Sequence, residues 1–294
     1  MTALAPSPAG DLPAPIPSRL PAGRVRRAAT GLLRQPALLA AWIIVLLMIA
    51  WAIAPGLFTS ASPYTSDPSV PFAAPSLEHL FGTDRLGRDL FARTVYGTST
   101  TLTATLIAVL VAFTFGSVIG LVSGYFGGLI DLVTMRIIDV FLSIPSLLLA
   151  MVIVSVLGYS TQNIALAVGI ASIASFARVM RSEVLSVVQS DYVQAAYGLG
   201  VGRFRVVVSH VLPNSLSSVL ALAALEFGTS VLAVASLGFL GYGAPPPEPE
   251  WGLLVAEGRD FVSQYPWISI IPGILIAALV ISTHRVSTSI RRSH

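Results

Sequence analysis

Two acidic side chains lie inside apolar stretches of this sequence, where they could meet a polar solute. Glu226 falls within the apolar run 216–237, and Asp139 lies near the start of another run, 132–157. Ionisable groups in such stretches are rare, and they usually serve a solute path or pair with another charge. For Asp139 the sequence favours a pair with Arg136, three residues earlier on the same helical face. For Glu226 a structural role and contact with a cation such as an ammonium group both remain open.

Other reactive groups are missing or scattered. The chain has no cysteine and no lysine, so all 17 of its basic residues are arginine. Disulfides and thiolate metal sites are thereby excluded, and so is a normal P-loop, which requires a lysine. The four histidines, His79, His210, His284 and His294, show no metal-ligand spacing. We therefore expect no catalytic residue, metal site or cofactor in this chain. If ATP drives the protein, partner subunits must bind the ATP and Mg.

The composition predicts which elements hold these acids. The chain has 294 residues, of which 54% are hydrophobic and 11% charged, against roughly a quarter charged in soluble domains. Apolar runs of roughly 20 residues, long enough to cross a bilayer as a helix, recur along it. We predict an all-α integral membrane protein with six transmembrane helices, at 36–57, 100–123, 132–157, 164–184, 216–237 and 267–283. Pro145 is expected to kink the third of them.

Arginines outside these runs predict the orientation. They gather at 19–34, 178–205 and 285–292, which the positive-inside rule places in the cytoplasm. The predicted organisation is a disordered, basic cytoplasmic tail at 1–35, the first span, an extracytoplasmic segment at 58–99, a five-helix core at 100–286 and a second cytoplasmic tail at 287–294. Both termini are then cytoplasmic in a multi-pass plasma (inner) membrane protein. The basic cluster before the first span could also contact anionic lipid.

The segment 191–214, between the fourth and fifth spans, is longer than most connections in helical bundles. It combines helix-forming residues at 193–199, two glycines, Gly200 and Gly202, and a second helical run that Pro213 is expected to stop. We predict a cytoplasmic helix-turn-helix elbow that stands off the membrane. The alternative is an amphipathic helix lying on anionic lipid.

This segment resembles the coupling loop of ATP-binding-cassette (ABC) importer permeases, whose pattern is Glu-Ala-Ala, three residues, Gly, nine residues, Ile, one residue, Leu-Pro. The positions that match at the required spacing are Ala195, Ala196, Gly200, Leu212 and Pro213. Gln194 replaces the glutamate, and His210 stands in place of the isoleucine. Motifs at 81–89, 124–146 and 247–273 resemble the C-type subunit of dipeptide/oligopeptide permeases. The glutamate that this group usually carries before a Leu-Ser-Phe-Leu-Gly run is replaced by Val234.

The resemblance implies a permease subunit of an ATP-driven importer for dipeptides or oligopeptides, a transport component and not an enzyme. Its implied partners are a second homologous permease, two ABC ATPases, an extracytoplasmic binding protein and membrane lipid, with no nucleic acid. The residues that would couple to the ATPase are Gln194, Ala195, Ala196, Gly200, Arg203, Leu212 and Pro213, the last two by setting the elbow angle. Glu226 and Asp139 are the candidates for the substrate path. Relatives in this group also handle nickel or haem chelates. An ion-coupled secondary transporter, which would need inverted repeats, is the alternative from another class.

Overall fold

The regular elements of the described part of the chain are all helices. The computed structural model describes residues 36–292, so the predicted tail 1–35 lies outside the described residues. The longer helices are α2 (Pro36–Ile53), α3 (Leu90–Phe126), α4 (Gly128–Ser143), α5 (Ser146–Leu157), α6 (Thr161–Val188), α9 (Leu212–Phe239) and α11 (Trp267–Arg292). The shorter ones are η1 (Pro55–Leu57), α7 (Asp191–Gly198), α8 (Arg203–Val206), η2 (Val207–Val211), α10 (Trp251–Gly258) and η3 (Arg259–Phe261).

Five helical segments are long and apolar enough to cross a membrane, and the bent pair α4–α5 makes a sixth if it counts as one span. This confirms the predicted all-α membrane fold, with five or six spans against the six expected. Helix α3 is much longer than the predicted second span, because it begins at Leu90 and not near residue 100. It begins there because the Asp89 carboxylate accepts a hydrogen bond from the backbone N–H of Ala92 at 2.7 Å, the usual role of an N-cap. The helix runs on for 37 residues.

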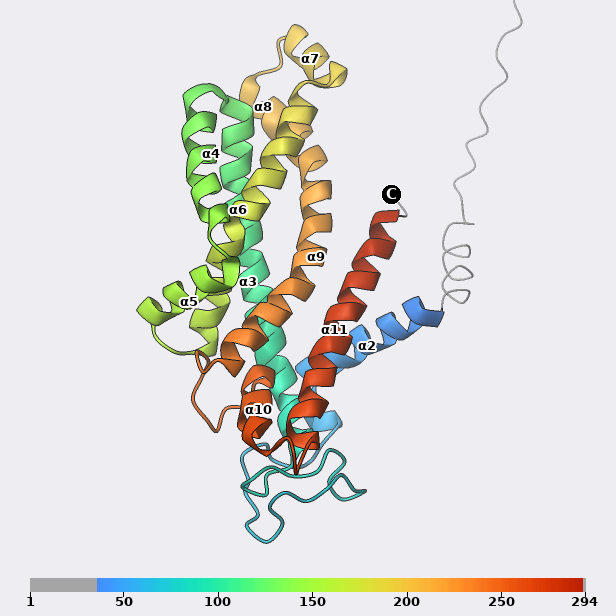
Figure 1. The fold of residues 1–294 in the computed structure, drawn as a ribbon. Helices are drawn as coiled ribbons and strands as arrows, with labels where there is room; N and C mark the ends of the chain where they lie inside the picture. The colour runs from blue at the N-terminus through green and yellow to red at the C-terminus, as the bar shows by residue number, and fades with distance from the viewer. Residues whose placement is uncertain (1–35, 293–294) are drawn as a thin grey trace, which may run out of the picture.

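The third predicted span is broken and not merely kinked. After Ser143 ends α4, Ile144 is extended, with φ −94° and ψ 129°, and Pro145 leads directly into α5. An extended residue before proline is the expected geometry, because the proline ring disfavours the helical region for its predecessor. The two helices meet at 93°, so α5 leaves the bundle sideways (Figure 1).

Pro213 does not stop a helix, contrary to the sequence expectation. Residues 203–239 form one continuous helix of 37 residues, in which α8 passes through the π-helical turn η2 into α9. Pro213 falls in the first turn of α9, directly after that wider turn. A proline is tolerated there because its missing N–H and its ring disturb few of the preceding hydrogen bonds. The second arm of the predicted elbow is therefore the beginning of α9, and Leu212 and Pro213 lie within this helix and not at an angle.

Helices α3 and α6 form the most closely packed pair in the bundle. Gly116, Gly120 and Gly124 of α3 face α6 so closely that a Cβ atom added at Gly120 would lie 2.4 Å from the carbonyl oxygen of Ala177. Small residues at one helix face allow this approach in membrane bundles. The two helices thus form a common frame on which the other elements are placed.

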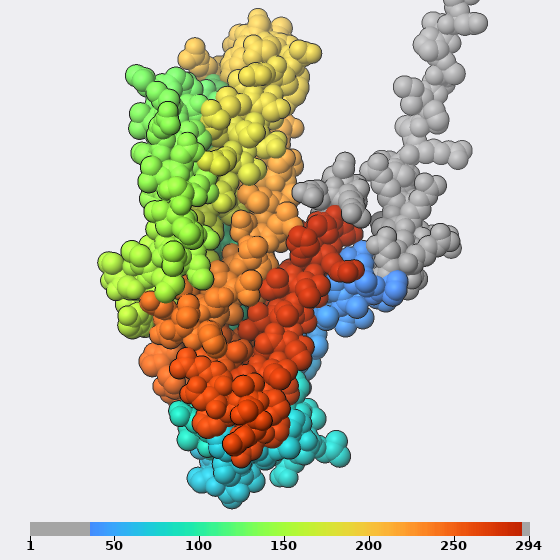
Figure 2. Space-filling view, in the orientation of Figure 1, coloured from blue at the N-terminus to red at the C-terminus, as the bar shows by residue number. Residues whose placement is uncertain are grey.

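The bundle has two unlike ends (Figure 1). The elbow, residues 191–206, contains α7 and α8. The cap, at the opposite end, consists of residues 54–89 together with α10 and η3. Figure 2 shows the yellow elbow at one tip of the molecule and the cyan segment of the cap at the other.

Candidate functional site

A cavity of about 410 Å³ lies between α4, α5, α6 and α9, and Glu226 stands on its wall. The hydroxyl-bearing residues that line the cavity with it are Ser146, Ser172, Ser175, Thr229 and Ser230. The Glu226 carboxylate accepts a hydrogen bond from the Thr229 hydroxyl at 2.6 Å, and no salt bridge among residues 36–292 includes it. A carboxylate in such a setting can accept hydrogen bonds from an ammonium group.

The break between α4 and α5 builds one wall of this cavity. Ile144, Pro145, Ser146 and Leu147, the residues of the break, all line it. A straight third span would carry these residues past the cavity, so the proline in the sequence has a direct effect on the shape of the site. The opposite walls come from Val168 to Ser175 on α6 and from Glu226 to Ala233 on α9.

Asp139, the other predicted acid, pairs with Arg178 of α6 and not with Arg136. The Arg178 guanidinium donates to Oδ1 of Asp139 at 2.5 Å. The sequence argument chose Arg136 because it lies on the same helix, whereas α6 brings Arg178 alongside α4 from 39 residues away. Both charged side chains remain exposed over more than half of their surface, 54% for Arg178 and 55% for Asp139.

A second ion pair joins the same two helices and was missed by the sequence analysis. Arg181 donates through Nε and Nη2 to both carboxylate oxygens of Asp131, and the Ser123 hydroxyl donates to the same carboxylate. This bidentate geometry is the stronger form of an arginine–carboxylate contact. The sequence carries little signal for this pair, because Arg178 and Arg181 are three residues apart whereas their partners Asp139 and Asp131 are eight apart.

The elbow is held to the bundle from its inner face. Val193 is fully buried in a cluster with Val184 of α6, Val206 of α8 and Val211 of η2. The hydroxyl groups of Tyr125 and Tyr197 lie 3.1 Å apart, which ties the end of α3 to α7. The elbow therefore has a fixed inner face.

Five of the seven predicted coupling residues lie on the elbow, whereas Leu212 and Pro213 lie within α9. Gln194, Ala195, Gly200 and Arg203 are exposed, and Ala196 is half-buried. The Gln194 amide donates to the Val188 carbonyl at 2.8 Å, so its side chain folds back onto the end of α6. Gly200 has φ +80°, and a Cβ there would meet nothing within 4 Å. This glycine is required by its backbone conformation and not by lack of space.

Two large apolar side chains on the elbow were not singled out from the sequence. Leu199 is 85% exposed and Phe204 is 82% exposed, on either side of the turn at Gly200. Single exposed apolar residues are common, but these two flank the residues that match the coupling-loop pattern. Together with Arg203 and Arg205 they give the elbow an apolar and basic surface.

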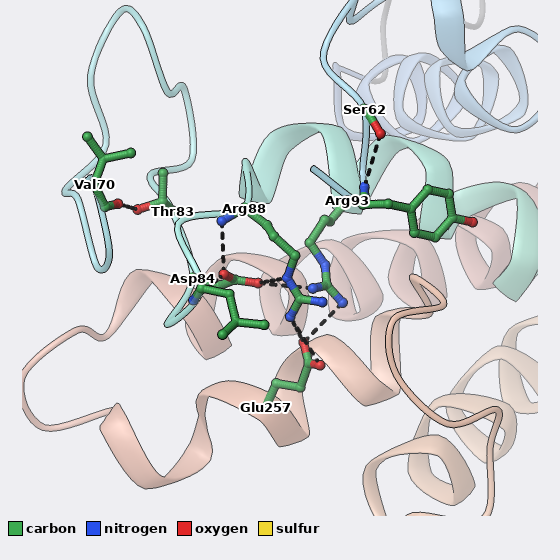
Figure 3. A network of polar contacts seen from close by, with 9 residues as sticks. Ser62, Val70, Thr83, Asp84, Arg88, Arg93 and Glu257 are labelled. Atoms are coloured by element: carbon green, nitrogen blue, oxygen red, sulfur yellow. Dashed lines mark hydrogen bonds and ion pairs between the residues drawn. The ribbon is translucent and has the colours of Figure 1, made fainter. Parts of the chain in front are cut away.

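The cap is organised by four charges that the sequence analysis did not connect (Figure 3). Arg88 pairs with Asp84 at 2.6 Å and with Glu257 at 3.3 Å, and Arg93 pairs with the same two acids, each at 3.0 Å. Burial raises the pKa of Glu257, against the opposing effect of Arg88. The network joins the segment before α3 to the far end of α10, at a separation in sequence that no local pattern reveals.

Glu250, at the other end of α10, is fully buried without a basic partner among the described residues. Its carboxylate accepts hydrogen bonds from the backbone N–H groups of Gly252 and Leu253 at 2.8 and 2.9 Å, which caps α10. A Cβ at Gly238 would lie 2.1 Å from this carboxylate, so only glycine fits there. Burial raises the pKa of Glu250 to about 7, more than these hydrogen bonds lower it. In the described part of the chain, no group of three metal-ligating side chains gathers.

Five or six apolar crossings, a cavity with polar side chains between four of the helices, and a protruding elbow at one end are the features of a membrane-spanning transport subunit. The family described as "Binding-protein-dependent transport system inner membrane component" matches residues 116–293. This chain belongs to that family. It is thus a multi-pass inner-membrane component of a transport system, as the motifs in the sequence indicated.

Relatives of known description extend over most of the chain. The dipeptide transport system permease protein DppC of Alkalihalophilus pseudofirmus is 41% identical over 249 residues, which cover 85% of this chain and 82% of that protein. The probable D,D-dipeptide transport system permease protein DdpC of Escherichia coli is 39% identical, covering 85% of this chain and 83% of its own length. The glutathione transport system permease protein GsiD of Pectobacterium atrosepticum is 36% identical over 88% and 86%.

Solved structures share the fold at lower identity. An amino acid ABC transporter chain superposes with a TM-score of 0.55 at 18% identity, covering 69% of this chain and 94% of its own. A chain of the MetNI methionine ABC transporter in an inward-facing conformation gives a TM-score of 0.54 at 17% identity, covering 67% and 95%. These two comparisons show the fold alone.

Proposed function

We propose that this chain is the permease subunit of an ATP-driven importer of short peptides, and that the Glu226 cavity is part of the peptide path. The observation that carries the proposal is the Glu226 carboxylate, placed among hydroxyl groups inside the bundle with no basic partner among the described residues. A peptide's ammonium group would pair with it by charge-assisted hydrogen bonds. The relatives named for dipeptide and glutathione transport support this solute class.

The elbow is the proposed contact with the ATPases. Its exposed outer residues, from Gln194 to Arg203, would receive one ATPase subunit, while the second ATPase receives the elbow of a second homologous permease. Because α8, η2 and α9 form one continuous helix, a displacement of Arg203 passes to Glu226 along a rod of roughly 34 Å at 1.5 Å per residue. ATP binding would thus move one wall of the cavity directly. ATP and Mg would be bound by the ATPases.

The proposed orientation places the elbow in the cytoplasm and the cap outside. At the elbow end, Arg203 and Arg205 are exposed and have no salt-bridge partner among the described residues, whereas Arg88 and Arg93 of the cap are neutralised by Asp84 and Glu257. The positive-inside rule counts basic residues, and the arginines of 178–205 and 285–292 outnumber those of the cap end. The cap would then receive the extracytoplasmic binding protein, and both termini would be cytoplasmic.

Uptake by the purified complex tests the proposal. The complex, isolated through this chain and placed in liposomes with its binding protein, is expected to take up labelled dialanine only when ATP is present on the elbow side, and a protonophore should not abolish uptake. Glu226→Gln should raise KM roughly tenfold, the effect of a lost charged hydrogen bond. Glu183→Gln, which removes a carboxylate outside the cavity, should not. Unchanged KM in Glu226→Gln would remove this residue from the path. Failure of the wild type to transport any peptide would remove the function itself.

A further inference from the structure

The Asp139–Arg178 pair is half-exposed on the surface that α4 and α6 share. Asp139 lies about 16 Å along α4 from its first residue, Gly128, at 1.5 Å per residue. Exposed apolar side chains precede and follow it on α4, including Leu132, Val133 and Phe141. Charged groups that lie among such apolar side chains in a membrane protein face a water-filled path or a protein partner. The half-exposed pair therefore marks a polar face of the bundle.

That face continues the Glu226 cavity by one helical turn. Ser175 of α6 and Leu142 of α4 both line the cavity. Arg178 follows Ser175 by three residues, and Asp139 precedes Leu142 by three, so both lie one turn nearer the elbow end on adjoining faces. The ion pair bridges the two helices there. It thus forms the rim of the cavity on the side towards the elbow.

The two ion pairs between α4 and α6 differ in how easily they open. Asp131 is held by two arginine nitrogens and by Ser123, and its side chain is 19% exposed. Asp139 is held by a single nitrogen of Arg178, and both partners are more than half exposed. Exposed single-contact pairs contribute little to stability. The Asp139 carboxylate can therefore leave Arg178 at little cost in free energy.

We propose that Arg178 binds the terminal carboxylate of the transported peptide, and that Asp139 occupies this position when the peptide is absent. The inference rests on the proposed function. It gives the same site two charged contacts, Glu226 for the ammonium end of the peptide and Arg178 for its carboxylate end. When a peptide binds, its carboxylate replaces that of Asp139 on the guanidinium, and the freed Asp139 side chain turns to water. The preferred substrate is accordingly a peptide with both termini free.

Two matched solutes test the assignment in the complete, reconstituted complex. Uptake of trialanine is compared with uptake of trialanine amide, which lacks the terminal negative charge, in the wild type and in Arg178→Gln. The ratio of kcat/KM for the two solutes should fall roughly tenfold in Arg178→Gln, through loss of the charged contact with trialanine alone. Any discrimination by the binding protein is the same in both complexes and cancels. Arg136→Gln removes a positive charge from α4 without touching the pair, and it should leave the ratio unchanged.

A second variant, Asp139→Asn, tests the same assignment if Arg178→Gln assembles poorly. Asp139→Asn frees Arg178 from its carboxylate, so it should lower KM for trialanine several-fold and leave KM for the amide unchanged. An unchanged ratio in both variants, with normal uptake of trialanine, would overturn the role of Arg178 and leave the importer intact. Absence of ATP-dependent uptake of either solute by the wild-type complex would instead overturn the proposed function, and this inference with it.

Discussion

The arginines of the cap and those of the elbow lie in opposite environments. In the cap, Arg88 and Arg93 are buried, and each contacts Asp84 and Glu257. On the elbow, Arg203 is exposed and has no acidic partner among the described residues. Glycines show the same contrast, since a Cβ at Gly87 of the cap would lie 1.8 Å from the carbonyl oxygen of Asp67, whereas Gly200 of the elbow faces open space. The charged groups of the cap are paired within the chain. The exposed groups of the elbow are available to contact a partner protein.

Breaking the cap network should have the largest effect on the stability of the subunit. Arg93→Met removes the fully buried guanidinium that faces both Asp84 and Glu257, and it leaves two buried carboxylates with one arginine. Breaking a buried pair in this way costs about 3–5 kcal/mol. Denaturant or thermal unfolding of the purified subunit in detergent measures the loss.

The matched control for this prediction is Arg259→Met. Arg259 also pairs with an acid, Asp260, near the end of α10, but both side chains are more than half exposed. Its removal should change the free energy of unfolding by less than about 1 kcal/mol. If the two variants lose equal stability, the buried network is not what holds the cap together.

A second prediction concerns Glu250, at the start of α10, which has no basic partner among the described residues. Glu257, near the other end of α10, is paired with arginine. The pKa of Glu250 in the folded state, about 7, lies above its ordinary value of 4.5, so the folded chain binds this proton more tightly than the unfolded chain does. Stability from this group is therefore fully present below pH 4.5, falls as the pH rises towards 7, and is constant above it. The total change is on the order of 3 kcal/mol.

The experiment is the pH dependence of unfolding in the wild type and in Glu250→Gln. Glutamine cannot ionise, so the difference between the two curves should slope between pH 4.5 and 7 and be flat on either side. Comparing slopes avoids the effect of the one backbone hydrogen bond that glutamine cannot accept, because its amide nitrogen is a donor only. Glu248→Gln, an exposed neighbour two residues earlier, should keep the wild-type slope. Parallel curves for the wild type and Glu250→Gln would show that Glu250 does not titrate in this window.

Features that depend on local pattern were predictable from the sequence. The apolar runs indicated the all-helical membrane fold, and the spacing from Ala195 to Pro213 indicated the family. The same local reasoning underestimated the bend at Pro145 and went wrong at Pro213, because a proline restricts its own backbone and that of its predecessor but does not determine the direction of the chain beyond it. The chain turned by 93° at the first proline and continued as a helix through the second.

Contacts between distant segments could not be predicted in the same way. Asp139 was assigned to Arg136 because both lie on one helix, but its partner is on α6, and the choice depends on how α3, α4 and α6 pack. The cap network likewise joins Arg88 to Glu257 across 169 positions. The spacing of apolar residues predicts which face of a helix is apolar. It does not predict which charged residues of two helices will pair. The residues that complete the cap were therefore missed, and so were Leu199 and Phe204, the two exposed apolar side chains of the elbow.

The smallest effect on stability, with the largest effect on assembly, is expected at Gly200. Gly200→Trp forces a side chain into the left-handed conformation, at a cost of about 1–2 kcal/mol, but the space around it is open, so the subunit should still fold. Its indole would stand between Leu199 and Phe204, where the ATPase is proposed to dock, and co-purification of the ATPase should fall more than roughly tenfold, the effect of about 1.4 kcal/mol. Gly200→Asn tolerates the same backbone conformation with a small side chain, and it should retain the ATPase. Equal recovery of the ATPase with all three chains would show that the exposed elbow is not its contact, and the contrast with the cap would then reflect only the need for a turn at this glycine.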